Sequence, residues 1–153
     1  TPRFSLTWSI KPSTFPGIAV TAQPNDSACY IYTSGTTGLP KAAVITHRRW
    51  LLASGGFAFG LEDNGPHDVI YCTLPLYHSS GQFAGWGSAL CSGAAILLRR
   101  RFSTREFWND VHAHGATVFI YIGELCRYLL NAPPSAKERG HHLRETAEGS
   151  FAQ

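Results

Sequence analysis

The sequence predicts an α/β fold with a largely parallel sheet and flanking helices. From about residue 27, apolar runs of strand length alternate with amphipathic stretches of helix length, which is the pattern of β-α units. The apolar runs are near-continuous, as expected for strands that are buried on both faces of a parallel sheet. The 153 residues, of which 44% are hydrophobic, are enough to build one domain with a core.

Two regions differ in composition. Residues 1–26 are rich in Pro, Ser and Thr and have no sustained hydrophobic period, so they are predicted to form a linker or partially ordered segment. Residues 27–153 carry the apolar runs and are predicted to hold the domain. Five of these runs are predicted strands, at residues 29–33, 42–46, 69–74, 94–98 and 117–122.

Four helices are predicted between and after these strands. They cover residues 47–59, 81–90, 104–112 and 124–130. Glycines weaken the first two. The third begins with capping-box spacing at residues 103–106 and places Phe107 and Val111 at i and i+4. The fourth is stopped by Asn131 and the following prolines. No particular element is predicted for the polar residues after Ser135.

The net charge of +3 is not concentrated in one part of the chain. Ten of the thirteen basic residues are Arg, and they are scattered except for pairs or runs at residues 48–49 and 99–101. This balance does not favour a nucleic-acid partner. We interpret the run at 99–101 as a solvated strand end in preference to a site for acidic lipid headgroups.

The four cysteines are far apart and form no Cys-x-x-Cys pair. They are predicted to be free, buried thiols in a reducing compartment, and no metal site is predicted. No apolar run reaches the roughly 18 to 20 residues that cross a bilayer, and the N-terminal residues do not resemble a signal peptide. The sequence therefore predicts no transmembrane or targeting segment in this chain.

The most informative string is Thr33-Ser34-Gly35-Thr36-Thr37-Gly38-Leu39-Pro40-Lys41, which directly follows an apolar run. Its glycines let backbone N–H groups converge on phosphate oxygens, its hydroxyls add donors, and its lysine supplies a countercharge. A Walker loop would need Gly-Lys-Ser/Thr leading straight into a helix. Here a Leu-Pro pair precedes Lys41 and a β-branched run follows it, so a strand-loop-strand phosphate site is predicted.

His78 is a second candidate site residue. It follows a predicted strand and precedes Ser79-Ser80-Gly81, which places it on a loop at the carboxyl end of that strand. Open α/β sheets bind their ligands at this end. An imidazole there is suited to donate a hydrogen bond to a carboxylate or to orient it. The alternative is an ordinary surface-loop histidine.

The string at residues 32–41 resembles the signature loop of the adenylate-forming superfamily, which contains acyl-CoA synthetases, luciferases and peptide-synthetase adenylation domains. Three further strings resemble the narrower family of fatty acid transport proteins and very-long-chain acyl-CoA synthetases. They are Lys41-Ala42-Ala43 running to His47-Arg48-Arg49, Leu74-Pro75-Leu76-Tyr77-His78, and Tyr121-Ile122-Gly123-Glu124-Leu125-Cys126-Arg127-Tyr128-Leu129-Leu130-Asn131. The resemblance covers about residues 30–142.

This resemblance implies roles for particular residues. Thr33, Ser34, Gly35, Thr36, Thr37, Gly38 and Lys41 would hold the phosphates of ATP. His78 would be catalytic and would lie beside the reacting carboxylate. Tyr121, Gly123 and Glu124 would lie near the acyl pocket. For Glu124 an ordinary role as a helix N-terminal acid is at least equally favoured.

The resemblance also implies the reaction and its cofactors. The parent enzyme would use ATP, Mg²⁺ and CoA to convert a fatty acid to an acyl-adenylate and then to acyl-CoA, as part of fatty acid metabolism and lipid transport. Residues 27–153 would be an incomplete AMP-binding domain, a partial N-terminal domain of such an enzyme. Membrane association, at the cytoplasmic face of the endoplasmic reticulum or plasma membrane, would come through parts not present here.

Several parts of that machinery are not found in the sequence. The Tyr-Gly-x-Thr-Glu string for magnesium, the ribose aspartate and the C-terminal lysine are missing, and no hydrophobic strand follows Leu143. We therefore expect the chain alone to be inactive or nearly so. Two alternatives stay open: adenylation of an aryl or amino acid, and a truncated, non-catalytic module that binds a nucleotide or acyl group.

Overall fold

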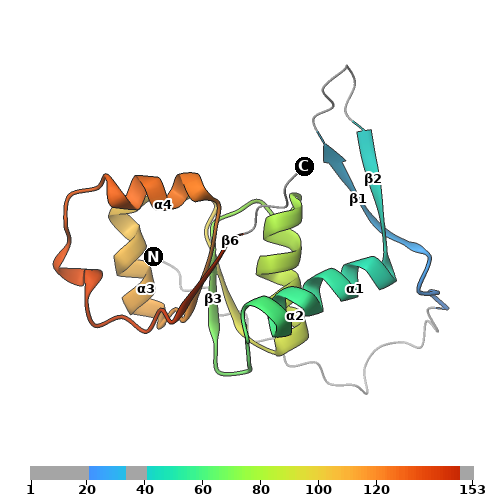
Figure 1. Ribbon diagram of the computed structural model, residues 1–153, viewed down its shortest axis with the longest axis horizontal. Helices are drawn as coiled ribbons and strands as arrows, with labels where there is room; N and C mark the ends of the chain where they lie inside the picture. Colours follow the sequence, from blue (N-terminus) through green and yellow to red (C-terminus); the bar gives the residue numbers. More distant parts are fainter. Residues whose placement is uncertain (1–20, 34–40, 149–153) are drawn as a thin grey trace.

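The computed structural model describes residues 21–33 and 41–148, and its main sheet is parallel, as predicted (Figure 1). The strands are β3 (Val69–Cys72), β4 (Ala95–Leu98), β5 (Val118–Tyr121) and β6 (Glu145–Glu148), in the order β4-β3-β5-β6. Each neighbouring pair in this sheet is parallel. The chain is therefore an α/β protein, and the predicted fold class is confirmed.

Helical segments cover both faces of the main sheet (Figure 1). On one face lie α1 (His47–Gly55), the π-helical segments η1 (Gly56–Leu61) and η2 (Ser80–Gly87), and α2 (Ser88–Ser92). On the other lie α3 (Thr104–His114) and α4 (Gly123–Leu130), followed by a short 3-10 turn, η3 (Ala136–Glu138). Among the described residues, no helix combines the length and apolar character needed to cross a membrane.

Alternate residues of β3 and β5 supply two separate cores. Ile70 and Ile120 pack in the cluster beneath η2, whereas Tyr71 and Phe119 pack with Phe107 of α3 on the opposite face. Both faces of these central strands are thus buried, which explains their continuous apolar runs. The prediction of two-sided burial is confirmed for β3 and β5, and it is wrong for β4, an edge strand whose end residues are exposed.

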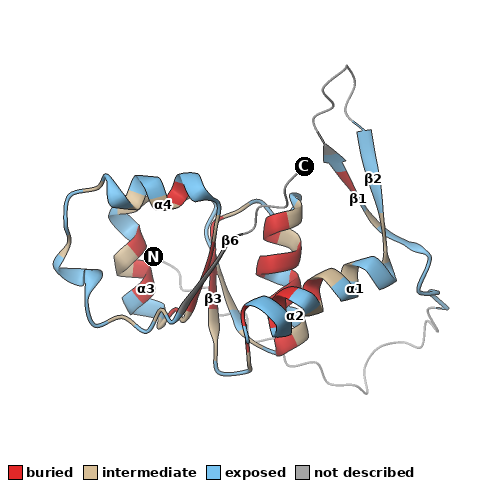
Figure 2. Cartoon of the chain, in the orientation of Figure 1, coloured by how far each residue is buried: buried red, intermediate tan, exposed pale blue. Residues whose placement is uncertain are grey.

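The first two strands form a separate hairpin. β1 (Ser27–Thr33) and β2 (Lys41–Thr46) pair antiparallel in a two-stranded sheet that projects away from the main sheet (Figure 1). Most of its described side chains are exposed, including Tyr30 at 58% and Tyr32 at 71% (Figure 2). The prediction of burial on both faces is therefore wrong here, because no further layer among the described residues covers the outer face of this two-stranded ribbon.

The helix predicted at 81–90 is instead η2 followed by α2, and its glycines have a packing role. A Cβ added at Gly85 would lie 2.7 Å from Cys72 Sγ, and one at Gly87 would lie 2.1 Å from Ser54 Oγ. A Cβ at Gly81 would lie 2.4 Å from the carbonyl oxygen of Pro75. The glycines therefore let η2 approach β3, α1 and the loop after β3 at backbone distance.

The remaining helices agree with the sequence in place but not in every detail. α3 buries Phe107 and Val111 together, as the i,i+4 spacing predicted. However, the Ser103 side chain makes no capping bond, so the predicted capping box is wrong. A capping box is present instead at Ser135 and Glu138, at the start of η3.

The polar C-terminal segment forms an unpredicted strand, β6, at the edge of the main sheet beside β5. Arg144, the residue before β6, fixes this segment in two places. Its backbone N–H donates to the carbonyl of Thr117, just before β5, at 3.0 Å. Its guanidinium donates to the Asp68 carboxylate at 2.9 Å and to the Asp63 carbonyl at 3.0 Å, both in the loop between η1 and β3.

Candidate functional site

The predicted phosphate-binding string is flanked by the two strands of the hairpin. β1 ends at Thr33 and β2 begins at Lys41, and the two residues directly oppose each other in the antiparallel register. The two predicted strands on either side of the string are thus confirmed, and Lys41 begins β2, which runs to Thr46 before α1 starts. The predicted residues Ser34, Gly35, Thr36, Thr37 and Gly38 lie outside the described residues.

Contacts from both strands join this hairpin to the α/β core. Ile31 of β1 is buried in the core cluster that includes residues of η2 and β5. Cys29 Sγ lies 3.7 Å from Gln82 Oε1 of η2, within hydrogen-bonding range for sulfur. Thr46, the last residue of β2, caps α1, because its hydroxyl accepts from the backbone N–H of Arg49 at 3.3 Å. The hairpin is thereby anchored to η2 and α1.

His78 lies in a turn between β3 and η2 that backbone hydrogen bonds hold in place. Its backbone N–H donates to the Pro75 carbonyl at 3.1 Å, and its carbonyl accepts from the backbone N–H of Gln82 at 2.9 Å. The backbone N–H of Ser80 donates to Nδ1 of the imidazole at 3.3 Å. Because Nδ1 accepts this bond, the neutral ring carries its proton on Nε2, and the exposed side chain can donate that proton outward.

Gln82 brings the two candidate regions together. Its side chain contacts Cys29 of β1, and it lies one helical turn after His78. The hairpin at Cys29 and the turn at His78 therefore both adjoin η2. π-helical segments are rare and often occur at functional sites, and η2 begins directly after this turn.

Tyr121 lies at the carboxyl end of β5, as predicted, but packs on the other face of the sheet. Its ring stacks on Phe119 with centroids 5.9 Å apart, within the core shared with α3. Since β5 pairs directly with β3, its carboxyl end still neighbours the loop that leads to His78. Gly123 is the first residue of α4 and is exposed there.

Glu124 is exposed in the first turn of α4 and is bonded to its own helix. It forms an ion pair with Arg127 at 2.5 Å. Hydrogen bonds from Tyr128 and then from Arg127 hold the pKa of the carboxyl below its usual value, and the same contact raises the pKa of Tyr128. These contacts fit the ordinary interpretation of Glu124 as a helix N-terminal acid.

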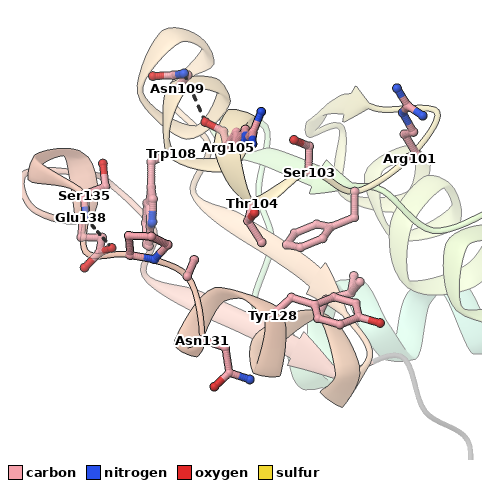
Figure 3. Close-up of a pocket in the computed structure, with 14 residues that line it drawn as sticks. Arg101, Ser103, Thr104, Arg105, Trp108, Asn109, Tyr128, Asn131, Ser135 and Glu138 are labelled. Carbon is pink, nitrogen blue, oxygen red and sulfur yellow. Dashed lines mark hydrogen bonds between the residues drawn. The ribbon is translucent and has the colours of Figure 1, made fainter.

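A groove of about 930 Å³ lies between α3, α4 and the loop before η3 (Figure 3). Phe102, Trp108 and Tyr128 supply aromatic walls, with Ser135 and Glu138 at the far end. None of the described candidate site residues lines it. The groove is on the sheet face away from η2, so it is distinct from the region of the hairpin and His78.

Two buried polar clusters were not predicted from the sequence. Asp110 of α3 is 4% exposed and accepts from the Tyr71 hydroxyl at 2.8 Å and from Arg99 Nε at 2.7 Å. Burial and then the bond to Asp110 raise the pKa of Tyr71. The fully buried Glu62 accepts from Ser88 Oγ at 2.7 Å and from the Asn64 amide.

The first of these clusters had a sequence signal. Asp110 follows Phe107 by three residues and precedes Val111, so it lies on the buried side of α3. All three arginines of the run at 99–101 are exposed, but the pairing with Asp110 gives Arg99 a structural role. In the described part of the chain, no group of three or more His, Cys, Asp or Glu side chains could hold a metal ion.

The cysteines are free, as predicted. Only Cys72 is fully buried, and the other three are half-buried, so the prediction of burial was too strong for them. Burial raises the pKa of the Cys72 thiol to about 11.

Residues 5–150 match the family described as AMP-binding enzyme. A medium/long-chain fatty acid–CoA ligase from Mycobacterium tuberculosis is 47% identical over 143 residues, which are 93% of this chain and 23% of the ligase. The long-chain fatty acid transport protein 3 of Homo sapiens is 51% identical over 120 residues, which are 78% of this chain and 17% of that protein. The chain thus spans about a fifth of the length of these relatives.

A solved structure gives the same picture of the fold. The ATP-bound structure of MatB from Rhodopseudomonas palustris matches with a TM-score of 0.70 and 28% sequence identity, over 82% of this chain and 24% of MatB. The sequence and structural matches agree with each other.

Proposed function

Because this chain belongs to the AMP-binding enzyme family, we propose that it is part of a long- or very-long-chain fatty acid–CoA ligase and that it binds ATP. The parent enzyme joins a fatty acid to AMP and then transfers the acyl group to CoA. Support comes from relatives described as a fatty acid–CoA ligase and a fatty acid transport protein, and from the likeness to an ATP-bound structure. Within this proposal, residues 27–153 are an incomplete AMP-binding domain that follows a linker.

The observation that carries the proposal is the pairing of Thr33 with Lys41 at the end of the hairpin that flanks the string. Because β1 ends and β2 begins at this pair, the string has one strand directly before it and one directly after it. We assign Thr33, Ser34, Gly35, Thr36, Thr37, Gly38 and Lys41 to the phosphates of ATP. A lysine at this position supplies the point charge that phosphate oxygens require.

His78 is proposed to bind the carboxylate of the fatty acid. With Nδ1 accepting from the Ser80 N–H, Nε2–H is the group that donates to a carboxylate oxygen and orients it. A carboxylate oxygen then attacks the α-phosphorus of ATP, an O–P bond forms, and pyrophosphate leaves. In the second step the CoA thiolate attacks the acyl carbonyl carbon, and AMP leaves with the bonding electron pair.

Tyr121, Gly123 and Glu124 are proposed to border the acyl site, because the carboxyl ends of β3 and β5 are neighbours. We propose that the parent enzyme uses Mg²⁺ and CoA because the chain belongs to the AMP-binding enzyme family. The donor set of the described residues provides no cluster for a metal ion, so no magnesium ligand is assigned and no step depends on one. Lipid transport and attachment to the cytoplasmic face of the endoplasmic reticulum or plasma membrane are likewise proposals for the whole protein.

Calorimetry with ATP and with a non-hydrolysable palmitoyl-adenylate analogue tests this function. We expect both ligands to bind the chain, and Lys41→Ala to weaken ATP binding by about tenfold, in line with the loss of one charge-assisted contact of about 1.4 kcal/mol. Lys137→Ala, which removes an exposed lysine bonded to Asn109, is the matched control. Equal affinity in all three proteins would argue against the phosphate site.

Substrate class is tested separately by ATP–pyrophosphate exchange with palmitate, benzoate and amino acids in the full-length parent. The proposal predicts exchange with palmitate. Exchange only with benzoate or an amino acid would support the other adenylating activities. Ligand binding without any exchange would support a non-catalytic module.

A further inference from the structure

The segment η2 contacts both parts of the proposed site. Its first residue, Ser80, donates its backbone N–H to the His78 ring at 3.3 Å. Two residues further on, Gln82 contacts Cys29 of β1 through its side chain, with 3.7 Å between Oε1 and Sγ. One side chain on η2 therefore links the strand that leads into the phosphate-binding string with the turn that carries His78.

The His78 side of this link is rigid. The turn is closed by the bond from the His78 N–H to the Pro75 carbonyl at 3.1 Å and by the bond from the Gln82 N–H to the His78 carbonyl at 2.9 Å. At Gly81 the backbone approaches Pro75 so closely that a Cβ would lie 2.4 Å from its carbonyl oxygen. His78 therefore cannot shift relative to η2 without breaking packed backbone contacts.

The hairpin side depends on few contacts. Among the described side chains of β1 and β2, those that are not exposed are Cys29, Ile31, Ile45 and Thr46. Ile31 and Ile45 supply non-directional apolar packing against the core. The hairpin also continues into α1, whose Trp50 ring meets Trp86 of η2 edge-on with centroids 5.4 Å apart. The Cys29–Gln82 contact adds a directional constraint on β1 itself.

A small movement at this contact would be enlarged at the phosphate end of the strand. Thr33 lies four residues beyond Cys29, which is about 13 Å at the usual rise of a strand, so a rotation of about 5° would move it by about 1 Å. Misplacement by about 1 Å between reacting groups can lower a rate about 100-fold. The side chain of Gln82 is therefore well placed to determine how ATP phosphates and a carboxylate at His78 meet.

We propose that Gln82 is a positioning residue: through Cys29 it holds β1 against η2 and thereby sets the spacing between the paired strand ends, Thr33 and Lys41, and the turn at His78. This inference rests on the proposed function, because it needs a nucleotide at one end and a carboxylate at the other. As a positioning residue, Gln82 acts through Cys29 and not by touching the substrate. Replacing Gln82 must therefore weaken a ligand that contacts both the hairpin and His78, and must have a small effect on a ligand that contacts only one of them.

The test compares two ligands on the same protein by calorimetry. ATP alone reports on the phosphate end, and the palmitoyl-adenylate analogue must engage both ends at once. Gln82→Ala and Cys29→Ala are each expected to raise the dissociation constant of the analogue about tenfold and that of ATP less than about twofold. Cys29→Ser keeps a donor towards Gln82 and is expected to stay close to wild type.

The possible outcomes separate the inference from the function. Equal weakening of both ligands, or no weakening of the analogue, would overturn the positioning role while leaving the proposed function intact. An effect of Gln82→Ala that Cys29→Ala does not share would mean that Gln82 acts on the ligand directly and would also overturn it. If wild type binds neither ligand, the proposed function fails and this inference fails with it.

Discussion

Removing the Asp110 carboxylate should destabilise the fold through the buried Tyr71 hydroxyl. In Asp110→Ala, Tyr71 loses the acceptor that lies 2.8 Å away, while its side chain stays 1% exposed and out of reach of water. Arg99 loses the same partner, but its side chain is 44% exposed and can be hydrated instead. The cost therefore comes mainly from the orphaned hydroxyl and only partly from the lost ion pair.

The magnitude follows from these exposures. A buried donor without a partner costs about 1–3 kcal/mol, whereas breaking a fully buried ion pair costs about 3–5 kcal/mol. Because Arg99 is half-exposed, the second figure must be discounted strongly. We expect Asp110→Ala to lower the free energy of unfolding by about 2–3 kcal/mol.

The assay is urea unfolding followed by tryptophan fluorescence, with two comparisons. Glu106→Ala removes an exposed carboxylate from the same helix and is expected to change stability by less than about 1 kcal/mol. Tyr71→Phe combined with Asp110→Ala should destabilise less than the sum of the two single changes, since no hydroxyl is then orphaned. If Asp110→Ala were no more destabilising than Glu106→Ala, the reasoning from burial would be refuted.

Three further predictions concern acid sensitivity, close packing and thiol reactivity. Burial alone would raise the pKa of Asp68, but hydrogen bonds led by the one from Arg144 lower it, so its stabilising contribution should be present above its unfolded pKa of about 3.9 and fade as pH falls below that value. Urea midpoints measured from pH 6 to pH 3 should fall less in Asp68→Asn than in wild type, and parallel curves would contradict this. Gly85→Ala should destabilise by about 1–3 kcal/mol, because its Cβ would meet Cys72 Sγ at 2.7 Å, whereas Gly55→Ala, with nothing within 4 Å, should be neutral or stabilising in thermal melts. With a pKa of about 11, Cys72 should react with a disulfide reagent at pH 7.5 far more slowly than the half-buried cysteines, and mass spectrometry showing equal labelling would count against its burial.

The central strands could be predicted from the sequence because strands buried on both faces consist almost entirely of apolar residues. β3 and β5 lie between two helical layers, so nearly every residue in them is apolar. β6 (Glu145–Glu148) has the sequence Glu-Thr-Ala-Glu, and because it lacks an apolar run it was not predicted. As an edge strand it pairs on one side only, and Arg144 helps to fix the segment through contacts with residues far away in the sequence.

The helical segments show where local rules stop. The glycines at 81, 85 and 87 suggest a weakened helix, yet the structure uses them to bring η2 against β3 and α1. Whether a segment is α- or π-helical depends on that packing, which propensity does not encode. Likewise, nothing local to residues 27–46 shows that the hairpin forms its own sheet apart from the parallel one.

The candidate site was predicted in part for clear physical reasons. The turn at His78 follows from a strand that ends before Pro75, and the strand-loop-strand arrangement follows from the β-branched run after Lys41. The face on which Tyr121 lies could have been predicted as well, because residues two apart on a strand share a face and Phe119 is a core residue. The contact between Cys29 and Gln82 could not, since it joins residues 53 positions apart.

Hydrogen–deuterium exchange with and without ATP tests the central claim most directly. If ATP is held where β1 ends and β2 begins and its α-phosphate meets a carboxylate at His78, protection should be concentrated in peptides that cover residues 33–41 and 76–82. Peptides from α3 and α4, on the other face of the sheet, should be unchanged. Protection confined to the groove between α3 and α4, or none at saturating ATP, would contradict the proposed nucleotide site.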